Sequence, residues 1–223
     1  MSSTPPRVIP HILTESLTRH SGMIFYGGPA GSGVDQTLQQ GLQSLKGRRV
    51  ETVGSLSSLE EGATAQVIHY RMGLRDLPLE RLVRLAESGI LVICEMSSTD
   101  CLTSLRQIYS LNFGEGRPHI LWRLSQQLIL VGAQMRVKSL QGNDEIDLFE
   151  MLLMTPQLKE ALRAEDLSFV EGVLQHGEEE SGALSFNQSL LQHLLRRHID
   201  MKTAFVSTRD PVHLDQLLKK VGI

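Results

Sequence analysis

The glycine-rich residues 27–37 leave few folds open to this chain. They directly follow the apolar run 23–26, and a helical pattern of leucines begins behind them. Strand, glycine-rich turn and helix, in this order, are the setting of a phosphate-binding loop, in which backbone N–H groups surround phosphate oxygens. Gly28 and Gly33, with four residues between them, have the glycine spacing of that loop. The stretch therefore predicts an α/β fold with this loop at the end of a buried strand.

The two positions after Gly33 depart from the phosphate-binding pattern. A functional loop has Lys and then Ser or Thr there, because Lys reaches the β- and γ-phosphates and the hydroxyl holds Mg²⁺. This chain has Val34, which has no charge, and Asp35, whose carboxylate would lie near the phosphates. Two like charges ~4 Å apart repel by about 4 kcal/mol at an effective dielectric constant of about 20. The residues that we expect to form this weakened nucleotide-binding turn are Gly28, Ala30, Gly31, Ser32, Gly33, Val34, Asp35 and Gln36.

Composition excludes several classes of function. Hydrophobic residues make up 41% of the chain and charged residues 21%, which is typical of a globular domain, and the net charge of −3 gives no reason to expect nucleic acid as a partner. The longest purely apolar run, 90–94, is far too short to span a membrane. Cys94 and Cys101 are too few for a metal or disulfide framework, so we expect two buried thiols. His193 and His198 are five residues apart, which does not suit a helical zinc pair, so we expect a solvated helix face.

Hydrophobic periodicity predicts alternating strands and helices up to about residue 154. The expected strands are 23–26, 50–53, 66–70, 90–94, 129–131, 135–137 and 146–154. The expected helices are a short one within 9–20 that starts after Pro10, the stretch from the glycine loop to 46, 77–88, 99–111 and 120–128. This alternation predicts a parallel sheet with crossover helices. The pattern beyond residue 155 is helical throughout, at 158–164, 167–174, 185–197, 201–206 and 212–221.

Four further segments, together with the glycine loop, carry a resemblance to a known family. They read AESGILV at 86–92, LSQQLIL at 124–130, EMLLMTPQLK at 150–159 and GALSFNQSL at 182–190. In order and spacing they resemble the type II and type IV secretion ATPase superfamily, and within it the type IV pilus retraction ATPases. The resemblance implies a RecA-like P-loop NTPase domain over residues 1–154 and a small all-helical C-terminal domain over residues 155–223. It also leads us to expect that the family's N-terminal PAS-like domain is missing.

Two acidic motifs of that family are altered in this sequence. The acidic pair expected after the second strand is replaced by VGSL at 53–56, with only Glu51 nearby. In the Walker B motif, Leu74 stands where the family has an acidic residue, whereas Arg75 and Asp76 are kept. Asp76 is also well placed to cap the helix expected to begin directly after it. We therefore expect the former Walker B residues to hold the loop and the helix start rather than a metal-bound water.

The His box of the family is altered as well. Ser97 replaces the histidine, and Glu95 adds a negative charge beside the expected phosphate position. Phosphoryl transfer depends almost wholly on positioned charges. The combined loss of the Lys, the Mg²⁺-holding hydroxyl, the acidic groups and the His therefore implies a catalytically inactive relative, with no catalytic residue, no metal and no cofactor.

An inactive relative of these motors would act by binding. The resemblance implies as its partner an active motor ATPase paralogue or the inner-membrane pilus or secretion platform, with a homo-oligomer as a further option. It also implies a cytoplasmic location, with peripheral association at the inner membrane as the alternative. Two other interpretations stay open: a divergent but active ATPase that binds ATP and Mg²⁺ and uses Glu51, Glu95 and Arg71, or a standalone structural protein that binds no nucleotide.

Overall fold

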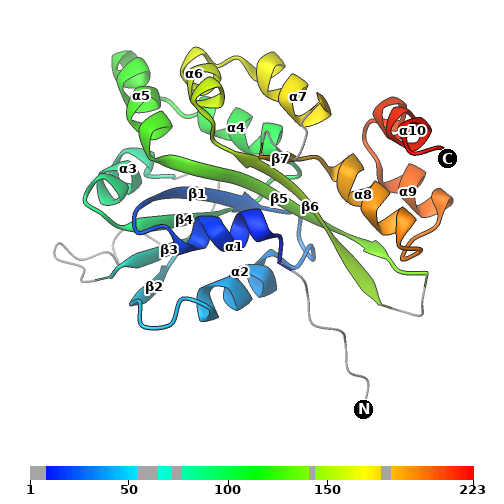
Figure 1. Ribbon diagram of the computed structural model, residues 1–223. Coiled ribbons are helices and arrows are strands. Elements are labelled where there is room, and N and C mark those ends of the chain that lie inside the picture. Colours follow the sequence, from blue (N-terminus) through cyan, green and yellow to red (C-terminus); the bar gives the residue numbers. More distant parts are fainter. Residues whose placement is uncertain (1–8, 55–64, 72–76, 141–143, 177–181) are drawn as a thin grey trace.

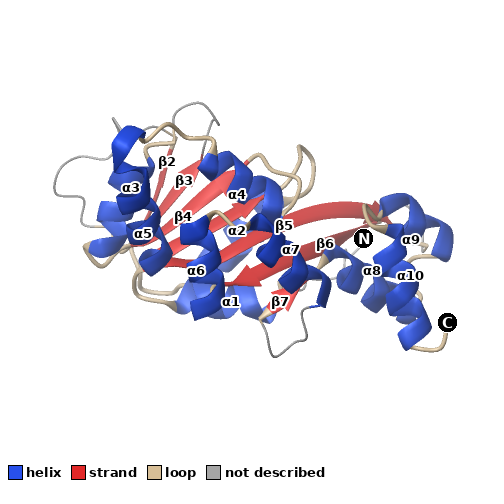
Figure 2. Cartoon of the chain, turned by 90° about the horizontal axis from the view of Figure 1, so that it is seen from above, coloured by secondary structure: helices blue, strands red, loops and turns tan. Residues whose placement is uncertain are grey.

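The described residues form a seven-stranded sheet with helices on both of its faces (Figures 1 and 2). The structure is a computed structural model and describes residues 9–54, 65–71, 77–140, 144–176 and 182–223. The strands are β1 (Gly22–Gly27), β2 (Val50–Val53), β3 (Val67–Arg71), β4 (Leu91–Met96), β5 (Leu128–Lys138), β6 (Glu145–Leu153) and β7 (Ala183–Leu184). The helices are α1 (His11–Thr18), α2 (Val34–Gln43), α3 (Leu79–Glu87), α4 (Cys101–Tyr109), η2 (Gly114–Gly116), α5 (Arg117–Gln127), α6 (Pro156–Ala164), α7 (Leu167–His176), α8 (Phe186–Leu195), α9 (Met201–Ser207) and α10 (Pro211–Lys220).

The strands lie in the order β2-β3-β4-β1-β5-β6-β7 across the sheet. β2, β3, β4, β1 and β5 are parallel, whereas β6 is antiparallel to β5 and β7 is antiparallel to β6. The prediction of a parallel sheet is therefore correct for five strands and wrong at this edge. β6 follows β5 through residues 139–144 alone. A connection of that length allows a hairpin but not the crossover that a parallel strand needs.

β5 is one continuous strand, whereas the sequence predicted two short strands on either side of residues 132–134. A Cβ atom on Gly132 would lie 2.6 Å from the ring of Tyr26, so glycine marks a close approach here and not a break. Gln134 is fully buried in the same strand. A buried polar residue is compatible with a central strand when its hydrogen bonds are made, and those of Gln134 are described below.

Alternate residues of β1 face two helix layers. Met23 and Phe25 belong to a buried cluster that includes residues of α3, α4 and α5, whereas Ile24 and Tyr26 belong to a second cluster with α1 and α2. All residues of β1 are buried, as expected for a parallel strand covered on both faces. The glycine loop therefore follows a strand that is packed on both faces.

The helix expected at 77–88 is α3, and it begins two residues later than predicted. Its N-cap position is Pro78, and Asp76, the predicted cap, lies outside the described residues. Its end is as predicted: Gly89 has a φ of 98°, and its N–H donates to the carbonyl of Ala86 at 3.1 Å. The Gly54–Ala65 connection lies outside the described residues over 55–64.

The region beyond residue 155 is helical apart from β7, which adds two residues to the edge of the sheet. Leu158, Leu190 and Leu214 from this region belong to the same buried cluster as Phe25 of β1. Helices α8, α9 and α10 lie together at one end of the sheet (Figures 1 and 2). None of the described helices is long and apolar enough to cross a membrane. The division at residues 154 and 155 stays a prediction.

Replacing Ser185 with Ala is expected to lower the free energy of unfolding by about 1 kcal/mol. Ser185 caps α8: its hydroxyl accepts from the N–H of Gln188 at 3.2 Å, and the Gln188 side chain accepts from the N–H of Ser185 at 2.7 Å. Urea unfolding measures the change. Ser110→Ala, at an exposed helix end, is the matched control and should change stability by less than about 0.5 kcal/mol. Equal effects of the two substitutions would contradict the prediction.

Candidate functional site

The glycine loop lies at the carboxyl end of β1 and leads into α2, as the sequence predicted. α2, which follows β1, packs on one face of the sheet, whereas α4, which follows the adjacent β4, packs on the other. Adjacent parallel strands whose helices go to opposite faces leave a crevice at their carboxyl ends, the usual ligand position in an open α/β sheet. A cavity of about 360 Å³ lies there, lined by residues 28–36, Glu95, Met96, Ser97 and Arg136.

Two glycines give the loop its shape. Gly33 is the N-cap of α2 and has a φ of 84°, a left-handed conformation that glycine adopts without strain. A Cβ atom on Gly28 would lie 2.6 Å from the carbonyl oxygen of Gln134, so only glycine fits there. No side chain caps α2 at Gly33, and the first N–H groups of a helix have no partner within the helix. The loop therefore keeps the backbone arrangement that suits an anion.

A buried chain of hydrogen bonds joins this loop to the sheet. The hydroxyl of Tyr26 donates to Gln134 Oε1 at 2.8 Å, and Gln134 Nε2 donates to the carbonyl of Ser32 at 2.9 Å. Burial, and to a smaller degree the charge of Asp147, raises the pKa of Tyr26 well above its ordinary value, so the phenol stays protonated and donates. Sequence reasoning missed Gln134. A glutamine between the mostly apolar stretch 128–133 and Met135 was the signal that pointed to it.

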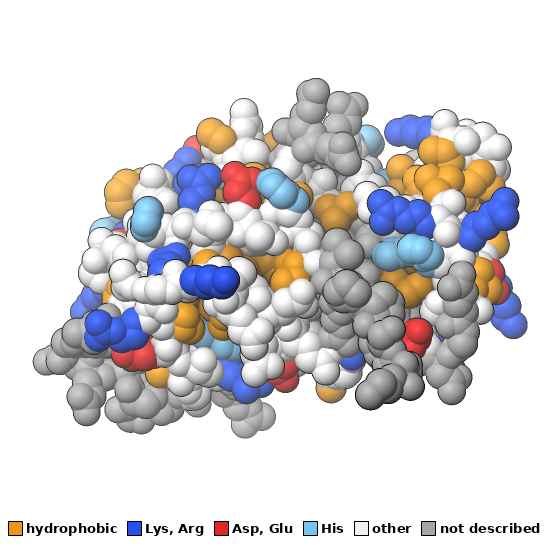
Figure 3. All heavy atoms as spheres, turned by 60° about the horizontal axis from the view of Figure 1, so that its bottom comes forward, with side chains coloured by type: hydrophobic (Ala, Val, Ile, Leu, Met, Phe, Trp, Pro, Cys, Tyr) orange, Lys and Arg blue, Asp and Glu red, His pale blue; other side chains and the backbone are white. Residues whose placement is uncertain are grey.

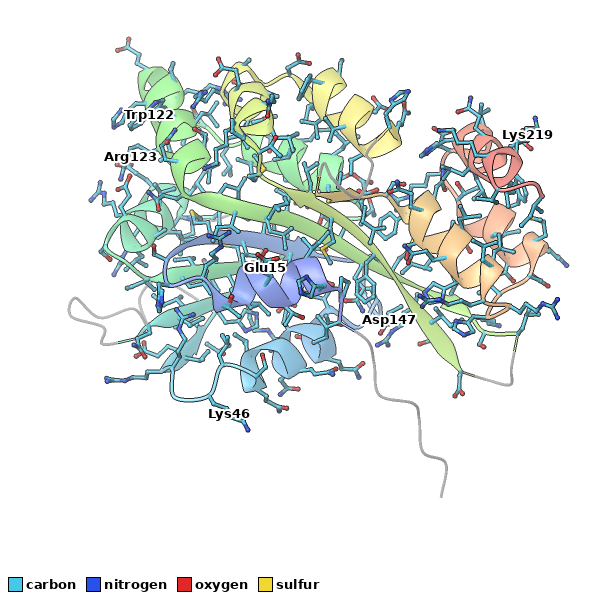
Figure 4. The ribbon with its side chains drawn as sticks, viewed as in Figure 1. Glu15, Lys46, Trp122, Arg123, Asp147 and Lys219 are labelled. Carbon is cyan, nitrogen blue, oxygen red and sulfur yellow. The ribbon has the colours of Figure 1, made fainter. Side chains whose placement is uncertain are left out.

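Arg136 of β5 lies over the loop and was also missed. Its Nη2 donates to Gln36 Oε1 at 2.6 Å, and its Nη1 donates to the carbonyl of Gly31 at 3.3 Å. Its Nε lies 2.8 Å from an oxygen of Asp147 on β6, and its Nη1 lies 3.5 Å from Glu145 Oε2. Asp147 is labelled in Figure 4. Arg136 therefore brings to the cavity a positive charge that Val34 does not provide. Two carboxylates already balance that charge.

Asp35, whose carboxylate was expected to lie near the phosphates, lines the cavity and has a partner of opposite charge there. Arg71 forms an ion pair with Asp35, and its Nε also lies 3.3 Å from Glu95 Oε2. His69 Nε2 lies 3.2 Å from the same oxygen of Glu95. The hydrogen bond from His69, assisted by Arg71, lowers the pKa of Glu95, so Glu95 is ionised at neutral pH. The repulsion that a phosphate would meet is smaller than that of two unopposed carboxylates, because Arg71 compensates them in part.

The other predicted site residues are divided between the cavity, the core and the undescribed segments. Val34 is buried and belongs to the cluster beneath α2, although it also borders the cavity. Ser97 lines the cavity, and its carbonyl accepts from Gln107 Nε2 at 2.9 Å. Glu51, on β2, does not line the cavity. The former Walker B residues lie outside the described part of the chain: Leu74, Arg75 and Asp76.

A second cavity, of about 250 Å³, shares no lining residue with the first and borders the buried carboxyl of Glu150. Glu150 Oε1 accepts from the N–H of Cys101 at 2.8 Å, at the start of α4. Burial raises the pKa of Glu150 to about 7. Cys94 and Cys101 are both free and buried, as predicted. Burial raises the pKa of both thiols, so neither is suited to act as a nucleophile at neutral pH.

His193 and His198 contact each other, so the prediction of a solvated helix face is wrong. Their Nδ1 atoms are 3.1 Å apart and both side chains are half-buried. The contact arises because Arg197 has a φ of 58°, which turns the chain back after α8. Burial, together with His198, lowers the pKa of His193. Within the described ranges, no three His, Cys, Asp or Glu side chains gather as a metal site would require.

Comparison with known proteins finds the fold but no close relative. No family model matches the chain, and no curated protein matches it in sequence. The similar solved structures include the ATPase DotB of Legionella pneumophila, the pilus retraction motor PilT with bound ADP, and DotB of Yersinia pseudotuberculosis. Their TM-scores are 0.74, 0.78 and 0.70, at sequence identities of 15%, 18% and 15%.

The similarity extends over most of this chain and less of the other proteins. It covers 92%, 97% and 87% of this chain, and 66%, 71% and 59% of the Legionella DotB, PilT and Yersinia DotB chains. At these identities the comparison shows the fold. The chain has the RecA-like α/β fold of pilus and secretion motor ATPases, which confirms the fold class and, at the level of fold, the resemblance found in the sequence.

Proposed function

We propose that this chain does not hydrolyse ATP and acts by binding a component of a type IV pilus or secretion machinery. One observation carries the proposal: the glycine loop keeps its backbone shape, while Val34 and Asp35 occupy the positions of the phosphate-binding Lys and the Mg²⁺-holding hydroxyl. Asp35 is engaged by Arg71, and Arg136 is engaged by Asp147, so the charged groups of the cavity already pair with one another.

The physical argument concerns charge. A transferring phosphoryl group needs positive charge and a metal ion on its oxygens, because the protein contributes little covalent chemistry. An incoming triphosphate would have to displace Asp147 from Arg136 or Asp35 and Glu95 from Arg71. Each such exchange gives up an existing ion pair, so the net gain from binding is small.

Titration calorimetry with Mg-ATP and a phosphate-release assay test the proposal on the full chain. We expect no binding at micromolar concentrations and no phosphate release, with an intact motor ATPase of this fold as the positive control. The double variant Val34→Lys, Asp35→Ser should gain Mg-ATP binding, because it restores the Lys and the hydroxyl on an existing loop. Its melting curve shows whether it is folded. Micromolar binding with turnover by the wild-type chain would overturn the proposal.

A divergent but active ATPase is the second candidate, and Glu95 is the observation in its favour. Glu95 is ionised, lines the cavity and is held in place by His69 and Arg71. A residue that positions water or Mg²⁺ needs the same properties. If the wild-type chain hydrolyses ATP, Glu95→Gln should abolish turnover while leaving binding in place.

The partner that we propose is an active motor ATPase of the same machinery or its inner-membrane platform, reached from the cytoplasm. A pull-down of these purified proteins with the full chain tests this part separately from ATP binding. Capture of neither, with ATP also unbound, would favour the third interpretation, a standalone structural protein.

A further inference from the structure

Five large apolar side chains are exposed on α8, on α9 and at residue 140, and three more, Val212, Val221 and Ile223, are exposed at α10. Val206 is 78% exposed, Leu195 53% and Leu140 51%, and Met201 and Phe205 are also exposed. Met201 and Phe205 are one helical turn apart on α9 and therefore lie on one side of it. We call these five residues the C-terminal apolar patch. Exposed apolar residues scattered singly need no explanation, whereas a group of this kind marks a surface that is covered in use.

The patch includes Leu140 because the β5–β6 edge contacts the turn after α8. The N–H of Leu140 donates to the carbonyl of His198 at 2.8 Å, and α9 contacts β5. The patch is therefore built from two parts of the chain that the fold brings together.

Positive side chains accompany the patch. Arg196, Arg197 and Lys202 are exposed, and none of them forms an ion pair with another described residue. Asp200 is the acidic residue within 193–206, and its carboxylate accepts from the N–H of Thr203 at 2.7 Å. Residues 193–206 thus carry a formal charge of +2, with His neutral, whereas the whole chain carries −3. Beside Leu140, residues 138–145 carry a formal charge of −1 from Lys138, Asp144 and Glu145, and Glu145 is paired with Arg136. Figure 3 shows apolar side chains at the C-terminal end with Lys, Arg and His side chains around them.

The shape of this end of the molecule is better suited to bind a flat surface than to bind a peptide segment of a partner protein. α8, α9 and α10 project from one end of the sheet (Figures 1 and 2), and no residue of the patch lines the two cavities described above or a third one between α7 and α10. A partner's amphipathic helix is commonly held in an apolar groove, and an extended segment at a sheet edge. A bilayer needs neither, because projecting apolar side chains enter the headgroup region while Arg and Lys contact the phosphates.

We propose that the C-terminal apolar patch binds the surface of an anionic phospholipid bilayer. Leu195, Phe205 and Val206 enter the boundary between headgroups and acyl chains, and Arg196, Arg197 and Lys202 contact lipid phosphates. Two of the three cations are arginines, whose planar guanidinium groups suit phosphate oxygens. This proposal does not depend on whether the chain hydrolyses ATP.

Co-sedimentation of the full chain with vesicles tests the electrostatic part. We expect binding to vesicles that contain phosphatidylglycerol, little binding to pure phosphatidylcholine, and release when salt rises from about 0.1 M to about 1 M. Each basic residue near an anionic surface contributes roughly fivefold to binding, so Arg196→Gln, Arg197→Gln, Lys202→Gln should bind on the order of 100-fold more weakly. The control is Arg19→Gln, Lys46→Gln, Lys159→Gln, which lowers the formal charge equally, from −3 to −6, and should bind much more strongly than the patch variant.

Tryptophan fluorescence tests the insertion. The chain has a single tryptophan, Trp122 on α5, which Figure 4 places at the end of the molecule opposite Lys219 of α10. The variant Trp122→Phe, Phe205→Trp moves the probe into the patch. Its emission should shift to the blue with phosphatidylglycerol vesicles, whereas that of the wild-type chain should not.

Three results would overturn the proposal. They are equal binding to both kinds of vesicle, equal loss of binding in the patch and control variants, and no blue shift in Trp122→Phe, Phe205→Trp while this variant melts as the wild-type chain does. A polyglutamate peptide is the competing ligand: if the chain binds it and does not bind the vesicles, the first of these results is met and the patch is assigned to an acidic protein.

Discussion

Replacing Gln134 with Leu is expected to lower the free energy of unfolding by about 2–5 kcal/mol, because it leaves two buried polar groups without partners. The groups are the hydroxyl of Tyr26 and the carbonyl of Ser32, which Gln134 joins at 2.8 and 2.9 Å. Leu has nearly the volume of Gln, so the loss reports the hydrogen bonds and not a cavity. Urea unfolding followed by circular dichroism measures the change.

A double-mutant cycle separates the two hydrogen bonds. Tyr26→Phe removes the hydroxyl, so in Tyr26→Phe, Gln134→Leu only the Ser32 carbonyl remains unpaired, and we expect part of the lost stability to return. Gln43→Leu, at the exposed end of α2, is the control and should change stability by less than about 0.5 kcal/mol. Additive losses in the cycle would show that Tyr26 and Gln134 are not coupled.

Glu150→Gln is expected to be more stable relative to the wild-type chain at pH 8 than at pH 4.5. The difference in unfolding free energy between variant and wild type should grow by up to about 3 kcal/mol between these pH values. Burial raises the pKa of Glu150 from its ordinary 4.5 to about 7, so the folded protein favours the protonated carboxyl. The contribution of Glu150 to the stability of the wild-type chain is therefore largest below pH 4.5. It falls as the pH rises toward 7 and changes little above pH 7. Gln keeps the oxygen that accepts from the N–H of Cys101 and carries no charge.

Unfolding free energies of both proteins between pH 4.5 and pH 8 check this prediction. The difference between Glu150→Gln and wild type should grow across that range. Glu171→Gln, an exposed carboxyl that borders the same cavity, is the control, and its difference should stay near zero. A difference for Glu150→Gln that does not vary with pH would show that Glu150 titrates normally.

Much of the fold follows from local patterns in the sequence. The strand–loop–helix unit at 23–43 was predicted correctly because two of its positions require glycine. Gly28 allows a close approach of the backbone, and Gly33 has a positive φ. The helix end at Gly89 was found for the same reason. The errors concern pairing: one strand, β5, was divided at Gly132, and the antiparallel direction of β6 was missed. The continuity of β5 depends on the close approach of Gly132 to Tyr26, which is distant in sequence. The direction of β6 follows instead from the short connection 139–144, a local signal that the prediction did not use.

The candidate site was predicted only in part. The loop residues and Ser97 do line one cavity, because they follow adjacent parallel strands. Arg136 and Gln134 were missed, since they reach the loop across more than 100 positions of sequence. Arg71 was named for a different role, and its ion pair with Asp35 changes what that carboxylate does in the cavity.

The sequence by itself determined which residues stand in the glycine loop, and therefore that Val34 and Asp35 replace the groups that handle phosphate and Mg²⁺. Only the tertiary structure decided the electrostatics of that cavity, by bringing Arg71 to Asp35 and Arg136 over Gly31. The reason is physical: side-chain identity and local backbone preference are properties of neighbouring positions, whereas the charge that a ligand meets depends on every group within a few ångströms, whatever its place in the chain.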